Sequence, residues 1–525
     1  MHQPRSIFGL NPQKMCSIYA ADVQSTNICC DFLPRILDTF KNVLASSNIF
    51  EFCATADLSD PTTDKSAVAL DVKVGSLMDP WEIPGLAHLC EHMLFMGTAK
   101  YPSENEYYKF LATHAGDSNA ATSTDYTNFY FDVKPEELPG ALDRFVQFFL
   151  SPLFTESATE REVCAVDSEH KNNLNNDSRR MTQVDRSRSK PGHDFRKFGT
   201  GNKKTLLEDT RKQGIDLRDA LLQFHKKWFR THLQFGHAHM SLMQLKKKGV
   251  TRQVWHDHPY GPEQLGKKVE AVPIKDSKWL SIRFPFPDLD SEYKSQPRRY
   301  ISHLIGDEAP GSLLSELKRR GWVSELESGY HTPASGFAFF TVSMDLSNDG
   351  LDHVDEIIEL MFNYIGMLRA KRPKEWIYEE LAELKAITFR FKDKESPMSL
   401  AIDVASKLQC IPFEDILSSN YLLTKYDPDR IKELLDKLTP SNMYIRVLAQ
   451  KFKGQEGSII EPIYGTEFME KDIDKETMQK YENALKTSNP AFHLPKKNEY
   501  IATNFDLKPR EITKSEHPRL IVDDS

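Results

Sequence analysis

Hydrophobic and polar positions along this chain alternate with two different periods. The segment 31–44 repeats apolar side chains every three or four residues, a spacing typical of an amphipathic helix. The segment 68–74 instead places a valine, leucine or alanine at most positions and a valine or leucine at every second one, and it stops at Gly75. This alternation predicts a half-buried strand.

A third pattern, between Gly85 and Gly97, predicts a short helix without a β-branched residue. Pro84 precedes this segment, and proline at the start and glycine at the end are typical of helix boundaries. The pattern that follows predicts strands at 117–123 and 127–133 and helices at 103–114, 135–150, 155–176 and 214–230. A basic loop is expected at 177–214, and from 232 to 258 the pattern fits neither a strand nor a helix.

The second half of the chain repeats the same kinds of element. Order returns at Val269, and the pattern predicts strands at 280–284 and 337–344 and helices at 298–305, 350–369, 373–391 and 397–409. Two segments of similar size and content indicate an internal duplication. The expected fold class is therefore α+β, with two related domains that each consist of a mostly antiparallel sheet covered by helices.

The composition is that of a globular protein long enough for more than one domain. Of the 525 residues, 27% are charged and 39% are hydrophobic. The net charge of -8 argues against nucleic acid as the main partner, and no stretch is apolar enough to cross a membrane. Seven cysteines without regular spacing indicate reduced thiols. Since no signal-peptide pattern is present, we expect a cytoplasmic protein, with mitochondria and peroxisomes left open.

Candidate chemistry enters at His88, Glu91 and His92, which form the order His-x-x-Glu-His inside the helix expected at 85–97. Positions four apart lie on one face of a helix, so the two imidazoles can bind one metal ion with Glu91 beside them. Imidazoles suit zinc, and a carboxylate next to a zinc-activated water can take its proton. The same order occurs in inverted zincin peptidases. The alternative is a buried helix with two hydrogen-bonded histidines.

A third ligand is required, since catalytic zinc sites use three protein ligands and keep one position open for water. The helix expected at 155–176 offers Glu162 and Glu169, which are seven residues apart and therefore share a face. By itself this pair is also typical of a solvated acidic face. His237 and His239 have no third ligand near them in the sequence, and we do not expect them to bind metal.

Several segments together resemble the pitrilysin-type family of metallopeptidases. The resemblance covers the chain from about residue 60 onward with one gap, and it rests on residues 61–65, 85–98, 115–120, 127–133, 141–145, 162–170, 197–202, 311–318 and 389–395. It implies the αβ roll of that family for both domains and a zinc-dependent metalloendopeptidase that hydrolyses small peptides, insulin-like or amyloid-like.

The resemblance also implies the roles of the site residues. His88, His92 and Glu169 would bind one zinc ion per chain, Glu91 would activate the water, and Glu162 would orient a ligand. Substrate would contact Phe95 beside the scissile bond, a strand that pairs with the extended peptide, and an exosite in the second domain. The substrate-binding residues implied in this way are Phe95, Asn119, Ala120, Gly306, Gly311 and Gly329.

The domain organisation follows from the same resemblance. We expect an atypical N-terminal extension at 1–57, a catalytic domain at 58–265 that is irregular at 232–255, a second domain with the exosite at 266–504, and a truncated linker between two halves at 505–525. Full-length members of the family are about twice as long as this chain. Ala121, Asp307 and Ala309 depart from residues usual in the family.

Two functions from different classes remain after these observations. The first is the zinc metalloendopeptidase, because His88, Glu91 and His92 of the motif are present and Glu162 and Glu169 follow downstream. The second is a catalytically weak or inactive peptide-binding homologue or partner subunit. Peptides are the expected partners in both cases, and a homodimer and a complementing C-terminal half are left open. A purely structural zinc site is disfavoured, since such sites use several cysteines.

Overall fold

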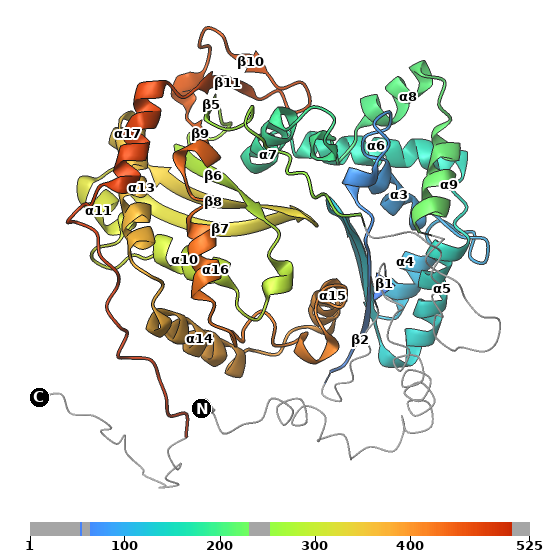
Figure 1. The fold of residues 1–525 in the computed structure, drawn as a ribbon. Helices are drawn as coiled ribbons and strands as arrows, with labels where there is room; N and C mark the ends of the chain where they lie inside the picture. The colour runs from blue at the N-terminus through green and yellow to red at the C-terminus, as the bar shows by residue number, and fades with distance from the viewer. Residues whose placement is uncertain (1–52, 55–62, 230–252, 507–525) are drawn as a thin grey trace, which may run out of the picture.

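The computed structural model describes residues 53–54, 63–229 and 253–506, which form two parts that lie side by side (Figure 1). The α+β class is confirmed, because each part contains its own sheet and its own covering helices. The helix expected at 31–44 and most of the irregular stretch at 232–255 lie outside the described residues. The domain boundaries stay predictions.

The first sheet has four strands in the order β1–β2–β4–β3, and all its pairs are antiparallel. Its strands are β1 (Cys53–Ala54), β2 (Ser66–Val72), β3 (Asp117–Thr122) and β4 (Thr127–Val133). Phe129 and Phe131 of β4 are fully buried, and their rings contact those of Phe149 and Phe145. The strand β3 lies at one edge and has β4 as its one neighbour among the described strands.

Helices cover the face of the first sheet on which this aromatic core lies. They are α3 (Leu86–Leu94), α4 (Glu106–Thr113), α5 (Leu138–Leu150), α6 (Glu156–Asn172) and α9 (Leu217–Trp228). Each of them contributes apolar side chains to the same buried cluster as the strands. The helices therefore share one core with the sheet, as expected for amphipathic helices that pack on one face.

The second sheet has seven strands in the order β10–β11–β5–β9–β6–β8–β7. Its strands are β5 (Lys267–Ala271), β6 (Trp279–Pro287), β7 (Val323–Ala334), β8 (Phe337–Leu346), β9 (Tyr444–Leu448), β10 (Ile459–Ile460) and β11 (Glu467–Asp472). Among the described strands, β5 and β9 form the one parallel pair, so the sheet is mostly antiparallel as predicted.

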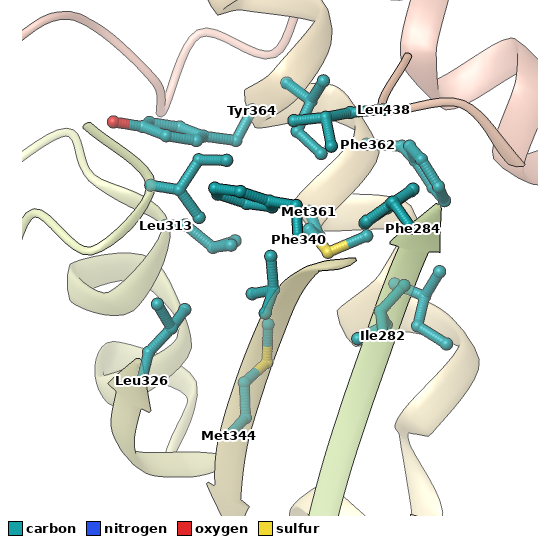
Figure 2. Close-up of a cluster of buried hydrophobic side chains, with 14 of the residues drawn as sticks. Ile282, Phe284, Leu313, Leu326, Phe340, Met344, Met361, Phe362, Tyr364 and Leu438 are labelled. Atoms are coloured by element: carbon teal, nitrogen blue, oxygen red, sulfur yellow. The ribbon is translucent and has the colours of Figure 1, made fainter. Parts of the chain in front are cut away.

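Eight helices accompany the second sheet in the described residues. They are α10 (Pro297–Ile305), α11 (Leu313–Arg320), α12 (Asn348–Asp352), α13 (Val354–Ala370), α14 (Glu375–Arg390), α15 (Pro397–Lys407), α16 (Pro428–Leu435) and α17 (Lys475–Lys486). Figure 2 shows their core, where Phe284 of β6 and Phe340 of β8 point toward Met361 and Phe362 of α13. None of the helices in the described part of the chain is long and apolar enough to cross a membrane.

Two helices connect the parts. The helix α7 (Asp177–Arg188) packs Met181 and Val184 against apolar side chains of the second sheet. On the other side, α15 lies against β2 of the first sheet, and Gln409 just after it donates hydrogen bonds to the carbonyl and carboxylate oxygens of Asp71 at 2.9 and 2.6 Å. The first sheet is therefore held between its own helices and a helix of the second part (Figure 1).

The prediction of a basic loop at 177–214 is wrong, because α7 and the short helix α8 (Asp209–Lys212) lie within this segment. The Asn176 side chain accepts a hydrogen bond from the first turn of α7, and the long helix expected at 155–176 ends before it. Several buried positions of α7 are polar, and one of them, Asp185, pairs with arginines of the second sheet. The buried polar residues include Arg180, Gln183 and Asp185. The helix consequently has no apolar stripe that a sequence pattern can detect.

Candidate metal centre

The helix α3 begins at a turn in which the first residue has to be glycine. Gly85 has a φ of 95°, and a side chain there would lie 2.3 Å from the main chain of Gly201. The carboxylate of buried Asp79 accepts hydrogen bonds from the main-chain N–H groups of Gly85 and Ala87, each at 2.7 Å. These donors have no partner within the helix, so Asp79 satisfies the first turn of α3 from outside it.

His88 and His92 lie one turn apart on α3, and their side chains approach Glu169 of α6. The Oε2 atom of Glu169 is 3.3 Å from His88 Nε2 and 3.8 Å from His92 Nε2. One ligand atom from each of the three residues lies within 4.8 Å of the others. Nitrogen and carboxylate donors at this separation can bind one divalent cation between them.

The other nitrogen of each imidazole is occupied by a partner. His88 Nδ1 is 2.8 Å from the main-chain oxygen of Thr200, and His92 Nδ1 is 3.0 Å from Oε2 of Glu162. Since both partners accept hydrogen bonds, each Nδ1 carries a proton, and each Nε2 faces Glu169 and can bind a metal once it is deprotonated. Metal-binding histidines likewise donate one ring N–H to a second partner and turn the other nitrogen toward the metal, so these residues fit a zinc ion.

The charges at the cluster favour positively charged imidazoles when no metal is bound. Burial by itself lowers the pKa of His92, but hydrogen bonds to Glu162 and Glu169 and the charge of Glu91 raise it to about 9. Hydrogen bonds from His88 and His92 hold the pKa of Glu169 far below its usual range. Protons thus occupy the cluster without a metal, and a cation that binds there has to displace them.

Glu91 lies on the same helix, between the two histidines in the sequence, and is 7% exposed. Its Oε2 atom accepts a hydrogen bond of 2.5 Å from the hydroxyl of Thr122, the last residue of β3. Glu91 is therefore a buried carboxylate with one identified hydroxyl partner, beside the three candidate ligands.

The structure places the remaining predicted site residues at two locations. Phe95 follows α3 and stacks on Tyr108 with ring centroids 5.5 Å apart, while Asn119 and Ala120 lie in the edge strand β3. These residues share the first part with the metal cluster. The other three residues belong to the second part. Gly306 ends α10, Gly311 precedes α11 and Gly329 lies in β7.

Two contacts of the centre were not predicted from the sequence. Thr200 lies within the segment 197–202 that supports the family resemblance, and this position was the available signal for it. Thr122 offered no signal, because a single hydroxyl at the end of a strand has no characteristic spacing. Both are positioned by contacts between segments distant in sequence.

Three family models match the chain. Residues 54–192 match the insulinase model of peptidase family M16, residues 241–384 match the M16 inactive domain, and residues 389–525 match the middle or third domain of M16 peptidases. Together these matches include both candidate metal-binding helices and the second sheet.

Curated relatives and solved structures agree with these matches. The chain is 49% identical over 481 residues to a putative zinc protease of Caenorhabditis elegans and 47% identical over 479 residues to human insulin-degrading enzyme. Each match covers 89% of this chain but only 49% and 47% of the relative. The crystal structure of pitrilysin superposes with a TM-score of 0.80 at 27% identity, covering 91% of this chain and 53% of that one. The chain spans about half the length of these relatives.

Proposed function

Because the chain belongs to the insulinase family of peptidases, M16, we propose that it is a zinc-dependent metalloendopeptidase that hydrolyses small peptides, insulin-like or amyloid-like. The observation that carries the proposal is the convergence of His88, His92 and Glu169 within 4.8 Å, with the Glu91 carboxylate on the same helix as the histidines. One zinc ion per chain is the proposed cofactor.

In the proposed mechanism His88, His92 and Glu169 hold the metal, and Thr200 and Glu162 fix the orientation of the two imidazoles. When bound, zinc supplies a Lewis acid that polarises the scissile carbonyl and lowers the pKa of an attacking water to about 7. Glu91 takes a proton from that water and delivers it to the leaving amine.

Peptide binding is proposed at the edge strand β3. Its residues Asn119 and Ala120 pair with β4 on one side, and the other side of β3 faces no described strand. An extended peptide that adds to this edge forms main-chain hydrogen bonds and runs next to the helix α3. Phe95 is proposed to contact the substrate side chain beside the scissile bond. Gly306, Gly311 and Gly329 are proposed as a second contact region.

A second candidate function is a peptide-binding homologue that cleaves weakly or not at all. The observation that favours it is the edge strand β3, whose side away from β4 faces no described strand and can bind an extended peptide whether or not the centre cleaves it. A homodimer or a complementing C-terminal half is proposed as a partner, and the expected cytoplasmic location stays a prediction.

Cleavage of an internally quenched peptide with and without a chelator distinguishes the two functions. We expect chelator-sensitive cleavage that returns on addition of zinc. The variant Glu91→Gln should keep its zinc, measured by metal analysis, and lose about 100-fold to 10,000-fold in kcat, the usual range for a general base. Glu82→Gln, at an exposed glutamate before α3, serves as the matched control.

Two results would contradict the proposal in different ways. A zinc-loaded protein that shows no chelator-sensitive cleavage, while it still binds peptide, leaves the peptide-binding homologue as the function. Undiminished cleavage by Glu91→Gln would exclude Glu91 as the base and would leave the metal-binding assignment untouched.

A further inference from the structure

Among the hydrogen bonds between described residues, one reaches the Glu91 carboxylate, and the hydroxyl of Thr122 donates it. Its Oγ1 atom lies 2.5 Å from Oε2 of Glu91 and 3.3 Å from Oγ1 of Thr127, which is its register partner on β4. The two distances already favour the carboxylate as the acceptor. A carboxylate has no proton to offer when ionised, so Thr122 must be the donor.

The position of the protons on the two threonines supports this assignment. Thr127 Oγ1 lies 2.7 Å from the main-chain oxygen of Val74, and a carbonyl oxygen can only accept. The single hydroxyl proton of Thr127 is therefore used by Val74. Toward Thr122, Thr127 can therefore only accept, at 3.3 Å, and the proton of Thr122 goes to the nearer and more strongly accepting carboxylate of Glu91 at 2.5 Å.

The turn that carries Thr122 is held on two sides. Toward α3, the main-chain N–H groups of Ser76 and Leu77 donate to the oxygens of Ser123 and Thr124 at 3.0 and 2.8 Å. Gly75 allows this approach, since a side chain there would lie 2.6 Å from the same main-chain atoms. The main chain next to Thr122 is thus held by contacts that side-chain rotation cannot release.

The second side of the turn contacts the hairpin between β7 and β8. The carboxylate of Asp125 is 7% exposed and accepts from the main-chain N–H of Ser335 at 2.9 Å and from its hydroxyl at 2.8 Å. Thr124 also donates to the main-chain oxygen of Pro333. The second sheet therefore fixes the end of β3, and through it the hydroxyl that contacts Glu91.

We propose that Thr122 is a positioning residue that holds one oxygen of the Glu91 carboxylate, so that the carboxylate keeps a single orientation toward the reacting water. This inference rests on the proposed peptidase function, in which Glu91 is the base. A base fixed in one orientation needs no reorganisation when it accepts the proton. Loss of the hydroxyl leaves Glu91 in place but free to rotate.

The test uses the full zinc-loaded chain and the variants Thr122→Val and Thr122→Ser. Valine keeps the shape and removes the hydroxyl, whereas serine keeps the hydroxyl. We expect Thr122→Val to lower kcat about tenfold to 100-fold at unchanged KM, the range for a hydrogen bond to a charged group, and Thr122→Ser to recover most of it. Zinc content should stay the same in both. Thr113→Val, on the surface of α4, is the matched control.

A second readout does not need turnover. Binding of a dipeptide hydroxamate, which shares a proton with a carboxylate beside zinc, is measured by calorimetry for wild type, Thr122→Val, Glu91→Gln and the double variant. We expect Thr122→Val to weaken binding about tenfold, and to cause no further loss when Glu91 is already glutamine, because coupled residues are not additive. Should Thr122→Val fail to fold, Thr122→Ala gives the same comparison.

The outcomes separate this inference from the proposed function. If Thr122→Val equals wild type within about twofold in both assays, or if its loss adds in full to that of Glu91→Gln, Thr122 does not act through Glu91 and the inference is overturned. If the wild-type chain binds zinc and hydroxamate but does not cleave, the peptidase function fails while the binding data still decide the role of Thr122.

Discussion

At the scale of single residues, two glutamates of the same helix contact different atoms of the histidines. Glu169 approaches both Nε2 atoms, whereas Glu162 contacts Nδ1 of His92 at 3.0 Å and is 14% exposed at its side chain. A carboxylate that accepts a hydrogen bond from Nδ1 fixes the orientation of the imidazole and makes its Nε2 a stronger metal ligand, without touching the metal itself. The two residues should therefore respond differently to substitution.

The variant Glu162→Gln tests this difference. An amide can still contact His92 but carries no charge, so the imidazole becomes a weaker ligand. We expect the affinity for zinc to fall about tenfold to 100-fold, measured by competition with a chromophoric chelator. Glu160→Gln, at an exposed position of the same helix that pairs with Arg211, should leave the affinity unchanged. An equal loss in both variants would show that the charge of α6 in general is responsible.

At the scale of elements, the sequence pattern predicted helices and strands well where one face is apolar and poorly where buried positions are polar. The strands β3 and β4 and the helix α3 agree with their predicted ranges to within a few residues. The helix α7 was missed, because several of its buried positions are polar, and one of them, Asp185, pairs with arginines of a distant sheet. Local spacing contains no information about such a partner.

The helix α11 allows a test of stability at this scale. Ser312 caps its N-terminus, and Glu316 accepts hydrogen bonds from Arg319 and Arg320 at 2.7 Å. These arginines lower the pKa of Glu316 to about 2 from its ordinary value of 4.5. Since the folded-state pKa is depressed, the stabilisation is present above pH 4.5 and is lost as the pH falls toward 2.

We therefore expect Glu316→Gln to lower the free energy of unfolding at neutral pH by about 1 kcal/mol, because the arginines are partly exposed and solvent screens the pair. The difference in unfolding free energy between Glu316→Gln and wild type should become smaller as the pH falls below 4.5, the pKa of the carboxyl group in the unfolded chain. Urea unfolding of both proteins at several pH values measures it. Glu308→Gln, whose ion pair with Lys318 is exposed, should change little. If the difference in unfolding free energy does not depend on pH, the stabilisation by Glu316 does not come from its negative charge.

At the scale of the whole molecule, the two parts are joined through a buried ion cluster. Asp185 of α7 is 2% exposed, and its carboxylate accepts from Arg283 of β6 and from Arg446 of β9, the latter at 2.8 Å. Trp255 adds a hydrogen bond of 2.9 Å to Asp194 beside this interface. The same interface holds the β7–β8 hairpin against the turn after β3. Contacts between the two parts therefore also position the end of β3, where Thr122 donates to Glu91.

Removing the negative charge at this interface should be costly. Asp185→Asn leaves two arginines, whose side chains are mostly covered, without their counter-charge, and we expect the free energy of unfolding to fall by about 3–5 kcal/mol. Guanidinium unfolding measures the loss, and limited proteolysis reports whether the two parts separate before either of them unfolds. The control is Glu104→Gln, which breaks an exposed pair with Arg161 and should cost less than about 1 kcal/mol. Equal losses would show that the cluster does not hold the parts together.

The sequence by itself determined the features that depend on neighbours along the chain. Two histidines four residues apart face one side of α3 because of helix geometry, and alternation in 68–74 and 127–133 places side chains on the two faces of a strand. From the residues alone, however, Glu162 and Glu169 were equivalent, since both lie on one face of α6.

Only the tertiary structure decided which of these glutamates faces both Nε2 atoms, and it also placed Thr122 against Glu91 and Asp185 between two arginines. The physical reason is the same in each case. Such contacts join segments far apart in the sequence, and their distances depend on how whole helices and sheets pack rather than on any local periodicity.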